Sequence, residues 1–377
     1  MRASFITSVD QIDRLSSEEK DRLKTITDQF VVKSNDYYLN LINWGDPDDP
    51  IRKIIIPNEG ELLEYGHWDA SDEETNYVVP GCQHKYETTA LLVVSEICGG
   101  YCRFCFRKRL FIHKEKEAIV DPQPGLEYIR RQKEITNVLL TGGDSLMLKT
   151  KKLGYILDQL NEIEHVKIIR LGTKLPAYYP MRIYEDEALL DLIRPYSTSQ
   201  KQIYIMSHVN HPKELTSEAI KAFDELKKAG AIVLNQTPIL KGINDDPFVL
   251  AELLNHLTYI GVNPYYFFIN RPVAGNYEFV LPLEQVYQIV EQAKAKISGI
   301  GKRVRLVMSH SSGKIEILAI ENGKAYLKYH QSRDGNYGQV MILDCPPHAT
   351  WFDDLPGNNQ CWTLQEHTQN DENMIRQ

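Results

Sequence analysis

From residue 90 onward, short apolar runs rich in Val, Ile, Leu and Tyr alternate with longer amphipathic segments. The six runs cover residues 90–94, 137–141, 166–171, 202–207, 231–236 and 263–269. Apolar strands that alternate with helices are typical of a parallel sheet covered by helices. A further apolar run follows at 303–308, so the pattern favours an open, partial (β/α)6 barrel over the closed eight-stranded form. Reactive groups in such barrels gather at the carboxyl ends of the strands.

The flanking segments differ from this repeating core. Residues 1–80 contain acidic, polar and proline-containing stretches, which predict a helical, loop-rich N-terminal extension. We expect the barrel over residues 81–300 and a separate C-terminal segment over 301–377. In that last segment, the turn sequence Ser332-Arg333-Asp334-Gly335-Asn336 separates two short apolar runs, 325–329 and 339–343, and predicts a β-hairpin.

The composition, with 42% hydrophobic and 25% charged residues, is that of a soluble globular protein. The net charge of −8 does not indicate a nucleic-acid surface, although Arg107-Lys108-Arg109 form a local basic cluster that we expect to meet anionic groups of small molecules. No apolar run reaches membrane-spanning length, and no signal pattern is found. The six cysteines do not suggest a disulfide framework, so we expect a cytoplasmic protein without membrane or nucleic-acid partners.

Three cysteines, Cys98, Cys102 and Cys105, have C-x3-C-x2-C spacing directly after the run 90–94. Thiolates are the ligands of iron–sulfur clusters, and a four-iron cluster held by three cysteines keeps one iron open for another ligand. A zinc site and three buried thiols are the alternatives. Zinc sites usually combine two separate cysteine pairs and close all four positions, and the chain has no second pair.

The cysteine spacing resembles the signature of the radical S-adenosylmethionine (SAM) superfamily, whose members bind SAM at the open iron and cleave it reductively to a radical. At the end of the second run stands Thr141-Gly142-Gly143-Asp144. This sequence resembles the superfamily's Gly-Gly-Glu motif, which holds the SAM amino group, with Asp144 in the acid position. Glycines here let the backbone approach a ligand closely.

Between about residue 79 and residue 318, the chain resembles the lysine 2,3-aminomutase family of this superfamily. The matching blocks lie at 79–86, 98–109, 140–148, 171–183, 207–212, 235–245 and 264–266, and include Ser207-His208-Val209-Asn210-His211-Pro212. Family members use SAM, a 4Fe-4S cluster and pyridoxal phosphate (PLP) to move an amino group between adjacent carbons of an amino acid. The resemblance therefore implies a radical SAM aminomutase.

The resemblance also implies roles for individual residues near the SAM end. His208 and Gln236 match residues that contact SAM, and each follows or ends its own predicted strand. Arg107 matches the arginine that binds the substrate α-carboxylate, and its planar guanidinium suits a bidentate contact. Lys108 and Arg109 are expected to be solvated or to face a phosphate.

Lys314 matches the lysine that links covalently to PLP, a role that requires an amine. The family usually has several glycines before this lysine, and here Ser-Ser-Gly precedes it. Lys85 replaces one family arginine at the PLP phosphate, while Thr89 stands where a second is expected. Tyr86 and His84 are retained beside the ring.

Substrate recognition is where the chain departs most from lysine-specific members. They carry an aspartate just after the sixth strand to pair with the distal ammonium, and this chain has Arg271 there. Two like charges brought together in a desolvated pocket are unfavourable, so Arg271 argues against lysine. An acidic side chain, as in glutamate, suits Arg271 better. The alternative is that Arg271 points outward.

Three functional hypotheses follow. The first is a 2,3-aminomutase with an amino-acid substrate and an electron donor such as flavodoxin or ferredoxin. The second is a PLP-independent radical SAM enzyme on the same scaffold, which Thr89 and the Ser-Ser-Gly sequence motivate. The third is a non-enzymatic electron-transfer or scaffold protein, although electron carriers usually complete all four cluster ligands. The sequence leaves homo-oligomer formation open.

Overall fold

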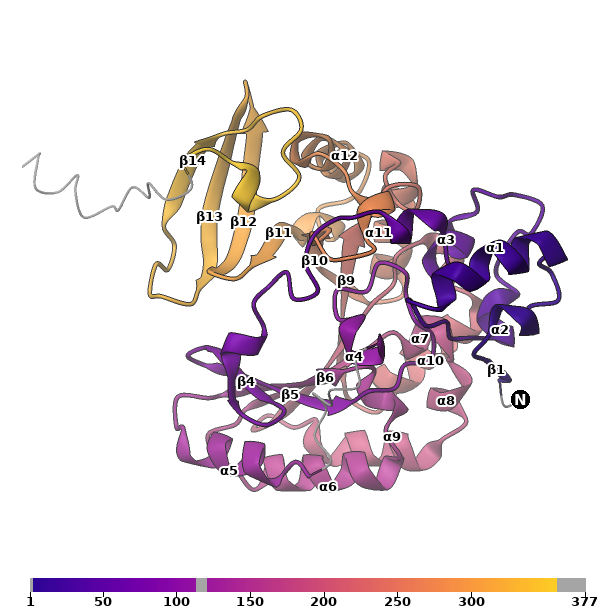
Figure 1. The fold of residues 1–377 in the computed structure, drawn as a ribbon. Coiled ribbons are helices and arrows are strands. Elements are labelled where there is room, and N and C mark those ends of the chain that lie inside the picture. The colour runs from indigo at the N-terminus through magenta and orange to yellow at the C-terminus, as the bar shows by residue number, and fades with distance from the viewer. Residues whose placement is uncertain (1–2, 113–120, 358–377) are drawn as a thin grey trace, which may run out of the picture.

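The computed structural model describes residues 3–112 and 121–357 (Figure 1). Twelve strands form one continuous sheet in the order β14-β13-β12-β11-β10-β9-β8-β7-β6-β5-β4-β3. Neighbouring strands are parallel from β5 to β11. These strands are β5 (Thr89–Ser95), β6 (Asn137–Gly142), β7 (Ile168–Thr173), β8 (Gln202–Ser207), β9 (Ile232–Ile239), β10 (Asn263–Ile269) and β11 (Arg305–His310). Because the edge strands β3 and β14 do not pair in this order, the described strands form the open, partial barrel that the sequence predicts.

The parallel strands coincide with the apolar runs of the sequence. β8 and β10 have the predicted bounds. Each of the other predicted strands begins and ends within three residues of its predicted bounds. In β6, Val138 and Leu140 are fully buried, as are Ile169 and Leu171 in the neighbouring β7. Strands with this burial read as apolar runs because helices cover the sheet.

Helices connect the parallel strands and cover the outside of the barrel. They are α5 (Gln123–Arg131), α6 (Thr150–Asn161), α7 (Leu175–Tyr178), α8 (Met181–Tyr184), α9 (Glu187–Ile193), α10 (Ser217–Lys228), α11 (Pro247–Tyr259) and α12 (Leu283–Ala295). Helix α10 shows how the sequence sets such bounds. The Thr216 hydroxyl caps its start by accepting a hydrogen bond from the Ala219 amide at 3.1 Å, and Gly230 follows its end at φ +90°.

Antiparallel strands extend the sheet at both edges. At one edge lie β3 (Tyr77–Val79) and β4 (Cys82–Tyr86), and at the other lie β12 (Gly313–Glu321), β13 (Lys324–Ser332) and β14 (Val340–Asp344). The predicted C-terminal hairpin is confirmed as β13 and β14, with Tyr326 opposite Ile342. The sequence analysis missed β3, β4 and β12. One sheet runs from β3 to β14 without a break and so includes strands from all three predicted segments. The division of the chain into segments at residues 80 and 300 stays a prediction.

The N-terminal extension is helical, as predicted, and it shares a second hydrophobic core with residues of the barrel. It contains β1 (Phe5–Ile6), α1 (Ser17–Thr27), β2 (Ser34–Asn35), α2 (Asp36–Leu39) and α3 (Pro50–Ile55), while the short α4 (Arg109–Ile112) follows the cysteines. Its buried side chains include Ile26 and Ile54, and they pack in the same cluster as Phe104 and Tyr178. The extension therefore packs directly against the segment that carries the cysteines. In the described ranges, no helix is both long and apolar enough to cross a membrane.

Candidate active site

A cavity of about 370 Å³ lies at the carboxyl ends of the parallel strands. His84, which the resemblance places beside the PLP ring, does not line this cavity, and its Nδ1 lies 2.8 Å from the Tyr128 hydroxyl. The other residues to which the resemblance assigns a cluster, cofactor or substrate role do line it. These residues are Lys85, Tyr86, Cys98, Cys102, Cys105, Arg107, Gly142, Gly143, Asp144, His208, Gln236, Arg271 and Lys314. The structure thus brings together positions that lie up to 229 residues apart in sequence, as expected for parallel strands that all end at one edge.

The three cysteines lie on the loop between β5 and α4. They are free and partly exposed. Burial raises the pKa of the Cys102 thiol to about 12 and also raises those of Cys98 and Cys105. Three soft sulfur donors on one loop fit a cluster, and iron binding would displace their protons. Within the described ranges, no three His, Cys, Asp or Glu side chains converge on a single-ion site, whereas a four-iron cluster spreads its thiolates over separate irons.

Contacts with the N-terminal extension set the shape of this loop. The Tyr101 amide donates to the Lys33 carbonyl and the Arg103 amide to the Ile54 carbonyl, both at 2.9 Å. A Cβ on Gly100 would lie 3.2 Å from the Ile55 and Tyr178 side chains. The glycine therefore lets the loop lie close against these two residues.

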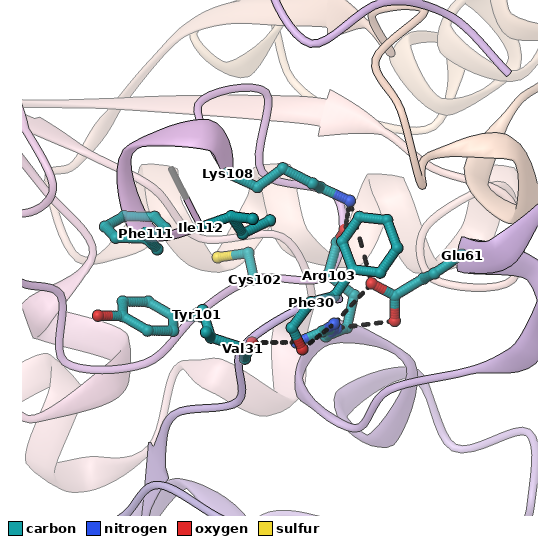
Figure 2. A pocket seen from close by; sticks show the side chains of 9 residues that line it. All are labelled: Phe30, Val31, Glu61, Tyr101, Cys102, Arg103, Lys108, Phe111 and Ile112. Carbon is teal, nitrogen blue, oxygen red and sulfur yellow. Dashed lines mark hydrogen bonds and ion pairs between the residues drawn. The ribbon is translucent and has the colours of Figure 1, made fainter. Parts of the chain in front are cut away.

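A buried ion pair anchors the loop next to Cys102 (Figure 2). Arg103 donates two hydrogen bonds to the Glu61 carboxylate, at 2.6 and 2.8 Å, and both residues are at most 3% exposed. Lys108 donates to the Arg103 carbonyl at 2.8 Å and to the Gly275 carbonyl at 3.0 Å, and burial lowers its pKa to about 8. The expectation that Lys108 is solvated or faces a phosphate is therefore wrong. The cavity of about 10 Å³ among these side chains is large enough for one water at most.

The two glycines at the end of β6 are required by a close backbone crossing. A Cβ on Gly142 would lie 2.4 Å from the Ser95 carbonyl oxygen, and one on Gly143 would lie 2.6 Å from that of Ile97. The Gly143 amide donates to the Ser95 carbonyl at 2.6 Å. The glycines thus fasten the end of β6 to the start of the cysteine loop.

Asp144 is buried beside these glycines, and its carboxylate accepts hydrogen bonds from neighbouring backbone amides and a hydroxyl. Its Oδ2 accepts from the Lys174 amide at 2.7 Å and from the Thr173 hydroxyl at 3.0 Å, and its Oδ1 accepts from the Leu146 amide at 3.0 Å. Burial raises its pKa to about 6, and these hydrogen bonds oppose the shift. Asp144 therefore links the ends of β6 and β7 at the cavity wall.

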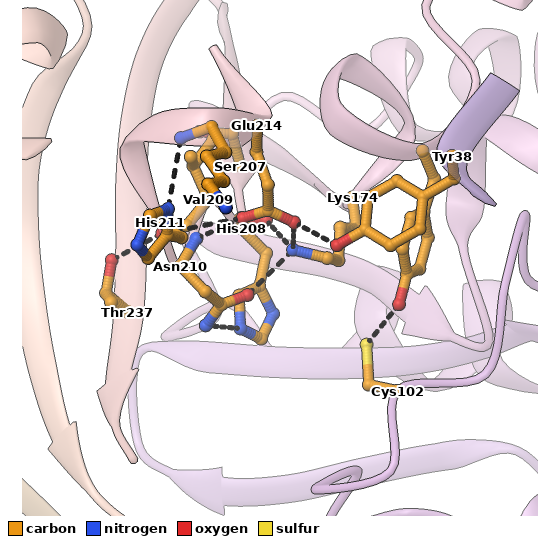
Figure 3. A network of polar contacts seen from close by, with 12 residues as sticks. Tyr38, Cys102, Lys174, Ser207, His208, Val209, Asn210, His211, Glu214 and Thr237 are labelled. Atoms are coloured by element: carbon orange, nitrogen blue, oxygen red, sulfur yellow. Dashed lines mark hydrogen bonds and ion pairs between the residues drawn. The ribbon is translucent and has the colours of Figure 1, made fainter. Parts of the chain in front are cut away.

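His208, at the end of β8, belongs to a polar network behind the cavity (Figure 3). Its Nε2 lies 3.2 Å from the side-chain nitrogen Nδ2 of Asn210, and its backbone carbonyl accepts a hydrogen bond from the Lys174 ammonium at 2.8 Å. Burial, followed by the charge of Lys174, lowers the pKa of His208 well below its usual value, so its imidazole is neutral. Gln236 lines the cavity from the neighbouring β9.

The centre of this network is a buried ion pair that the sequence analysis did not find. The Lys174 ammonium donates to Glu214 Oε1 at 2.5 Å and to Asn210 Oδ1 at 2.7 Å. The Tyr38 hydroxyl donates to the same carboxylate oxygen at 2.6 Å. Lys174 lies in the matching block around residue 171, but nothing in the sequence indicates that its partner is Glu214, 40 residues later.

Lys314 lies at the start of β12, and its ammonium faces two aromatic rings of β10. Its Nζ is 4.4 Å from the centre of the Tyr266 ring and 5.8 Å from that of Phe268. Burial lowers its pKa to about 7, and the positive charges of Arg170, Arg271 and Lys85 contribute to the shift. Near neutral pH, a large fraction of this amine is therefore unprotonated and nucleophilic.

The glycine that precedes Lys314 is fixed by the sheet. A Cβ on Gly313 would lie 2.3 Å from the Gln331 carbonyl oxygen of β13. This close approach explains the single glycine retained in Ser-Ser-Gly and places Lys314 at the cavity wall.

Two further cations lie at this end of the cavity. Lys85 donates to the His310 carbonyl at 2.6 Å, and burial lowers its pKa to about 8. Arg170, which the sequence analysis missed, lines the cavity from β7 and donates to Asn137 Oδ1 at 2.8 Å. Burial also raises the pKa of Tyr86, beside Lys85, to about 12. This end of the cavity is therefore strongly positive.

Arg107 already has an internal carboxylate partner. Its Nη2 donates to Glu73 Oε1 at 2.6 Å and its Nε to Oε2 at 2.9 Å, while Nη1 donates to the Thr141 hydroxyl at 3.2 Å. Arg109 also donates to Glu73, at 2.9 Å. Burial alone would raise the pKa of Glu73, but Arg107, then Arg109 and Arg271, hold it well below its usual range. Glu73 lies in the N-terminal extension, and no sequence signal connects it to Arg107.

Arg271 points into the cavity rather than outward. Its guanidinium carbon lies 3.9 Å from the centre of the Phe106 ring. Its buried Nη1 has no hydrogen-bond partner among the described residues. Burial lowers its pKa to about 10, although Glu73 opposes the shift. Arg271 is therefore a cation whose Nη1 has no acceptor among the described residues.

Comparison with known proteins gives independent evidence for the family of this chain. The sequence profile of the radical SAM superfamily matches residues 92–254. A protein of Aquifex aeolicus (strain VF5), provisionally described as an L-lysine 2,3-aminomutase, is 48% identical over 355 residues, covering 94% of this chain and 95% of that protein. The glutamate 2,3-aminomutase of Clostridioides difficile (strain 630) is 36% identical, covering 82% and 73%. The L-lysine 2,3-aminomutase of Clostridium subterminale is 33% identical, covering 76% and 68%.

Proposed function

Because the chain belongs to the lysine 2,3-aminomutase family of the radical SAM superfamily, we propose that it moves the amino group of an acidic amino acid, such as glutamate, between carbons 2 and 3. The family consists of isomerases, and membership implies a 4Fe-4S cluster, SAM and PLP. When bound, these groups supply a carbon radical that removes hydrogen from the substrate and a carrier for the migrating nitrogen. The protein binds and orients the reactants and excludes water.

The side chains of the cavity are suited to hold these groups. Cys98, Cys102 and Cys105 offer three thiolates on one loop. At the opposite end, Lys314 offers an amine with a pKa of about 7 for covalent linkage to PLP. Lys85 and Arg170, which line the same wall, supply positive charge for its phosphate. Thr89, which stands where relatives carry an arginine, also lines the cavity, and Arg170 replaces the missing charge.

The observation that favours an acidic substrate is the environment of Arg271. Its buried Nη1 has no hydrogen-bond partner among the described residues, and an unpaired polar group in such a position is unfavourable. A side-chain carboxylate of the substrate would accept from it and compensate its charge. An ammonium group, as in lysine, would instead add a positive charge beside Arg271 and Lys85.

The α-carboxylate has a second arginine available. A guanidinium has five N–H donors. Arg107 donates one N–H of Nε and one of Nη2 to Glu73, and one N–H of Nη1 to the Thr141 hydroxyl. Two N–H groups therefore remain for a substrate carboxylate. Arg107 and Arg271 would then each bind one carboxylate of a dicarboxylic amino acid. Glu73 would stay in place and orient Arg107.

The proposal includes a one-electron donor such as flavodoxin or ferredoxin, because reductive cleavage of SAM consumes an electron. It also places the enzyme in the cytoplasm, since exposed thiolates and clusters require a reducing compartment.

The test is turnover by the anaerobically reconstituted enzyme with L-glutamate or L-lysine, with products identified by NMR. We expect glutamate to be converted to 3-aminopentanedioate with a kcat/KM at least about tenfold above that for lysine, the scale of one charged hydrogen bond. A preference for lysine would overturn the substrate assignment. Glutamate-dependent SAM cleavage without any need for PLP would instead support the PLP-independent hypothesis.

The variant Arg271→Gln tests the residue itself. We expect kcat/KM for glutamate to fall by about tenfold to a hundredfold, because a hydrogen bond to a charged group contributes about 1.5–3 kcal/mol. Arg131→Gln is the control, since the Arg131 side chain on α5 is 79% exposed. Equal kcat/KM values in the two variants would contradict the role of Arg271.

A further inference from the structure

The middle cysteine of the loop has a hydrogen-bonding neighbour that its motif does not include. Tyr178 ends the short helix α7, and its hydroxyl lies 3.1 Å from Cys102 Sγ. Tyr178 is 1% exposed, so water does not compete for this contact. The contact joins the loop after β7 to the cysteine loop after β5.

The Tyr178 ring is held in place on several sides. The Tyr38 ring packs against it edge to face at a centroid distance of 4.2 Å. Gly100 of the cysteine loop lies against its other atoms, since a Cβ there would come within 3.2 Å of the ring. Its backbone carbonyl accepts from Asn35 Nδ2 at 2.8 Å. The hydroxyl is therefore directed at Cys102 by packing as well as by the hydrogen bond.

The direction of the hydrogen bond follows from the chemistry of a cluster ligand. Between a free thiol and a hydroxyl, either group can donate. A cysteine bound to iron is a thiolate and has no proton to donate. A tyrosine hydroxyl has a pKa of about 10 and keeps its proton near neutral pH. In the loaded protein, Tyr178 is therefore the donor and Cys102 the acceptor.

Neighbouring polar groups do not compete for the Tyr178 hydroxyl. The Lys174 ammonium lies 5.1 Å from the centre of the Tyr178 ring and is bound to Glu214 at 2.5 Å. The Tyr38 hydroxyl donates to Glu214 at 2.6 Å and not to sulfur. Two buried tyrosines thus pack against each other, and only one of them donates to a cysteine sulfur.

We propose that Tyr178 is a positioning residue that raises the reduction potential of the cluster by donating a hydrogen bond to the Cys102 thiolate. Hydrogen bonds to cluster sulfurs stabilise the added negative charge of the reduced state. Reduction transfers one electron from an external one-electron donor to the cluster, and no bond forms or breaks in this step. The inference concerns the cluster alone and is independent of which amino acid is the substrate.

The test is a potentiometric titration of the reconstituted protein, without substrate, followed by the electron paramagnetic resonance signal of the reduced cluster. In Tyr178→Phe, we expect the ratio of reduced to oxidised cluster at a fixed potential to fall about tenfold, which is about 59 mV for a one-electron couple. The matched control is Tyr38→Phe, which removes an equally buried hydroxyl that does not contact sulfur. We expect its ratio to stay within about twofold of that of the unaltered protein, because the Tyr38 hydroxyl donates to Glu214 and not to a cluster sulfur.

Unchanged potential in Tyr178→Phe, at equal iron and sulfide content, would overturn the proposal, as would an equal shift in Tyr38→Phe. If Tyr178→Phe does not retain a cluster, fluorotyrosine incorporated at position 178 keeps the ring and hydroxyl in place. Because fluorotyrosine is the more acidic donor, we expect it to shift the potential upward. No shift with fluorotyrosine would also overturn the proposal.

Discussion

The two ends of the cavity use charge differently. At the cysteine end, charged side chains are paired within the protein, as in Arg103 with Glu61 and Lys174 with Glu214. At the opposite end, Lys314 faces aromatic rings and Arg271 has a buried nitrogen without a hydrogen-bond partner among the described residues. The first end is thus electrostatically complete in the protein itself, whereas the second requires an anion to complete it. Under the proposed function, the first end would hold the cluster and SAM, and the second would hold PLP and the substrate.

The largest effect is expected from Lys314→Ala. Removal of the amine would remove the proposed covalent link to PLP, so we expect loss of the absorbance band of bound PLP and a fall in turnover of more than about a thousandfold, the scale for residues that react covalently. Lys324→Ala on the adjacent strand β13 is the control, because its side chain is 46% exposed. A normal PLP band in Lys314→Ala would show that the amine is not the attachment point.

Glu61→Gln tests the claim that the cysteine end depends on internal pairing. The substitution leaves Arg103 as a buried charge without its counter-ion, so we expect the free energy of unfolding to fall by about 3–5 kcal/mol. Urea denaturation of the metal-free protein measures it. Glu59→Gln in the same segment is the matched control, since the Glu59 side chain is 71% exposed. Similar losses in both variants would contradict the special role of the Arg103 pair.

The pH dependence of PLP attachment sharpens the description of the opposite end. Only the unprotonated Lys314 amine reacts, and its pKa is lowered to about 7. We therefore expect the rate to rise about tenfold per pH unit below this value and to level off above it, as measured by the growth of the PLP band. In Arg271→Gln, one neighbouring positive charge is lost, so the midpoint should move upward. A midpoint near the usual lysine pKa would contradict the burial of this amine.

The smallest effect is expected for the stability of Arg271→Met. Arg271 has little internal pairing, and methionine removes the guanidinium from above the Phe106 ring but leaves an apolar side chain at this position. We expect the free energy of unfolding to change by less than about 1 kcal/mol, because a partly desolvated charge is removed together with its attraction to Glu73. A loss as large as that in Glu61→Gln would remove the distinction between the two ends of the cavity.

The sequence predicted those features that depend on local pattern and on strand polarity. The apolar runs located the parallel strands, and parallel strands necessarily bring their carboxyl ends to one edge. For this reason Cys98 and His208 could be expected at one edge of the sheet, whereas the role of Lys314 followed from the family resemblance alone. The hairpin of β13 and β14 followed from its turn sequence in the same way.

The partners of the charged residues could not be predicted. Arg107 binds Glu73 and Arg103 binds Glu61, 34 and 42 residues away, and no periodicity connects such positions. Strand β12 alternates apolar and polar residues, which is a strand signal, but the sequence analysis considered its first residues only as a cofactor loop. The contact of Tyr178 with Cys102 depends on how two separate segments pack, and the sequence of neither segment indicates that they are in contact.

The hydrogen bonds between the cysteine loop and the N-terminal extension have a consequence for the order of assembly. Two amides of the loop, Tyr101 and Arg103, donate to carbonyls of Lys33 and Ile54. The extension precedes the loop in the sequence, and these hydrogen bonds help to set the shape of the loop that carries the cysteines. We therefore expect the cluster to be incorporated only after the N-terminal extension has packed against the cysteine loop. Cluster incorporation would then depend on the correct folding of both segments.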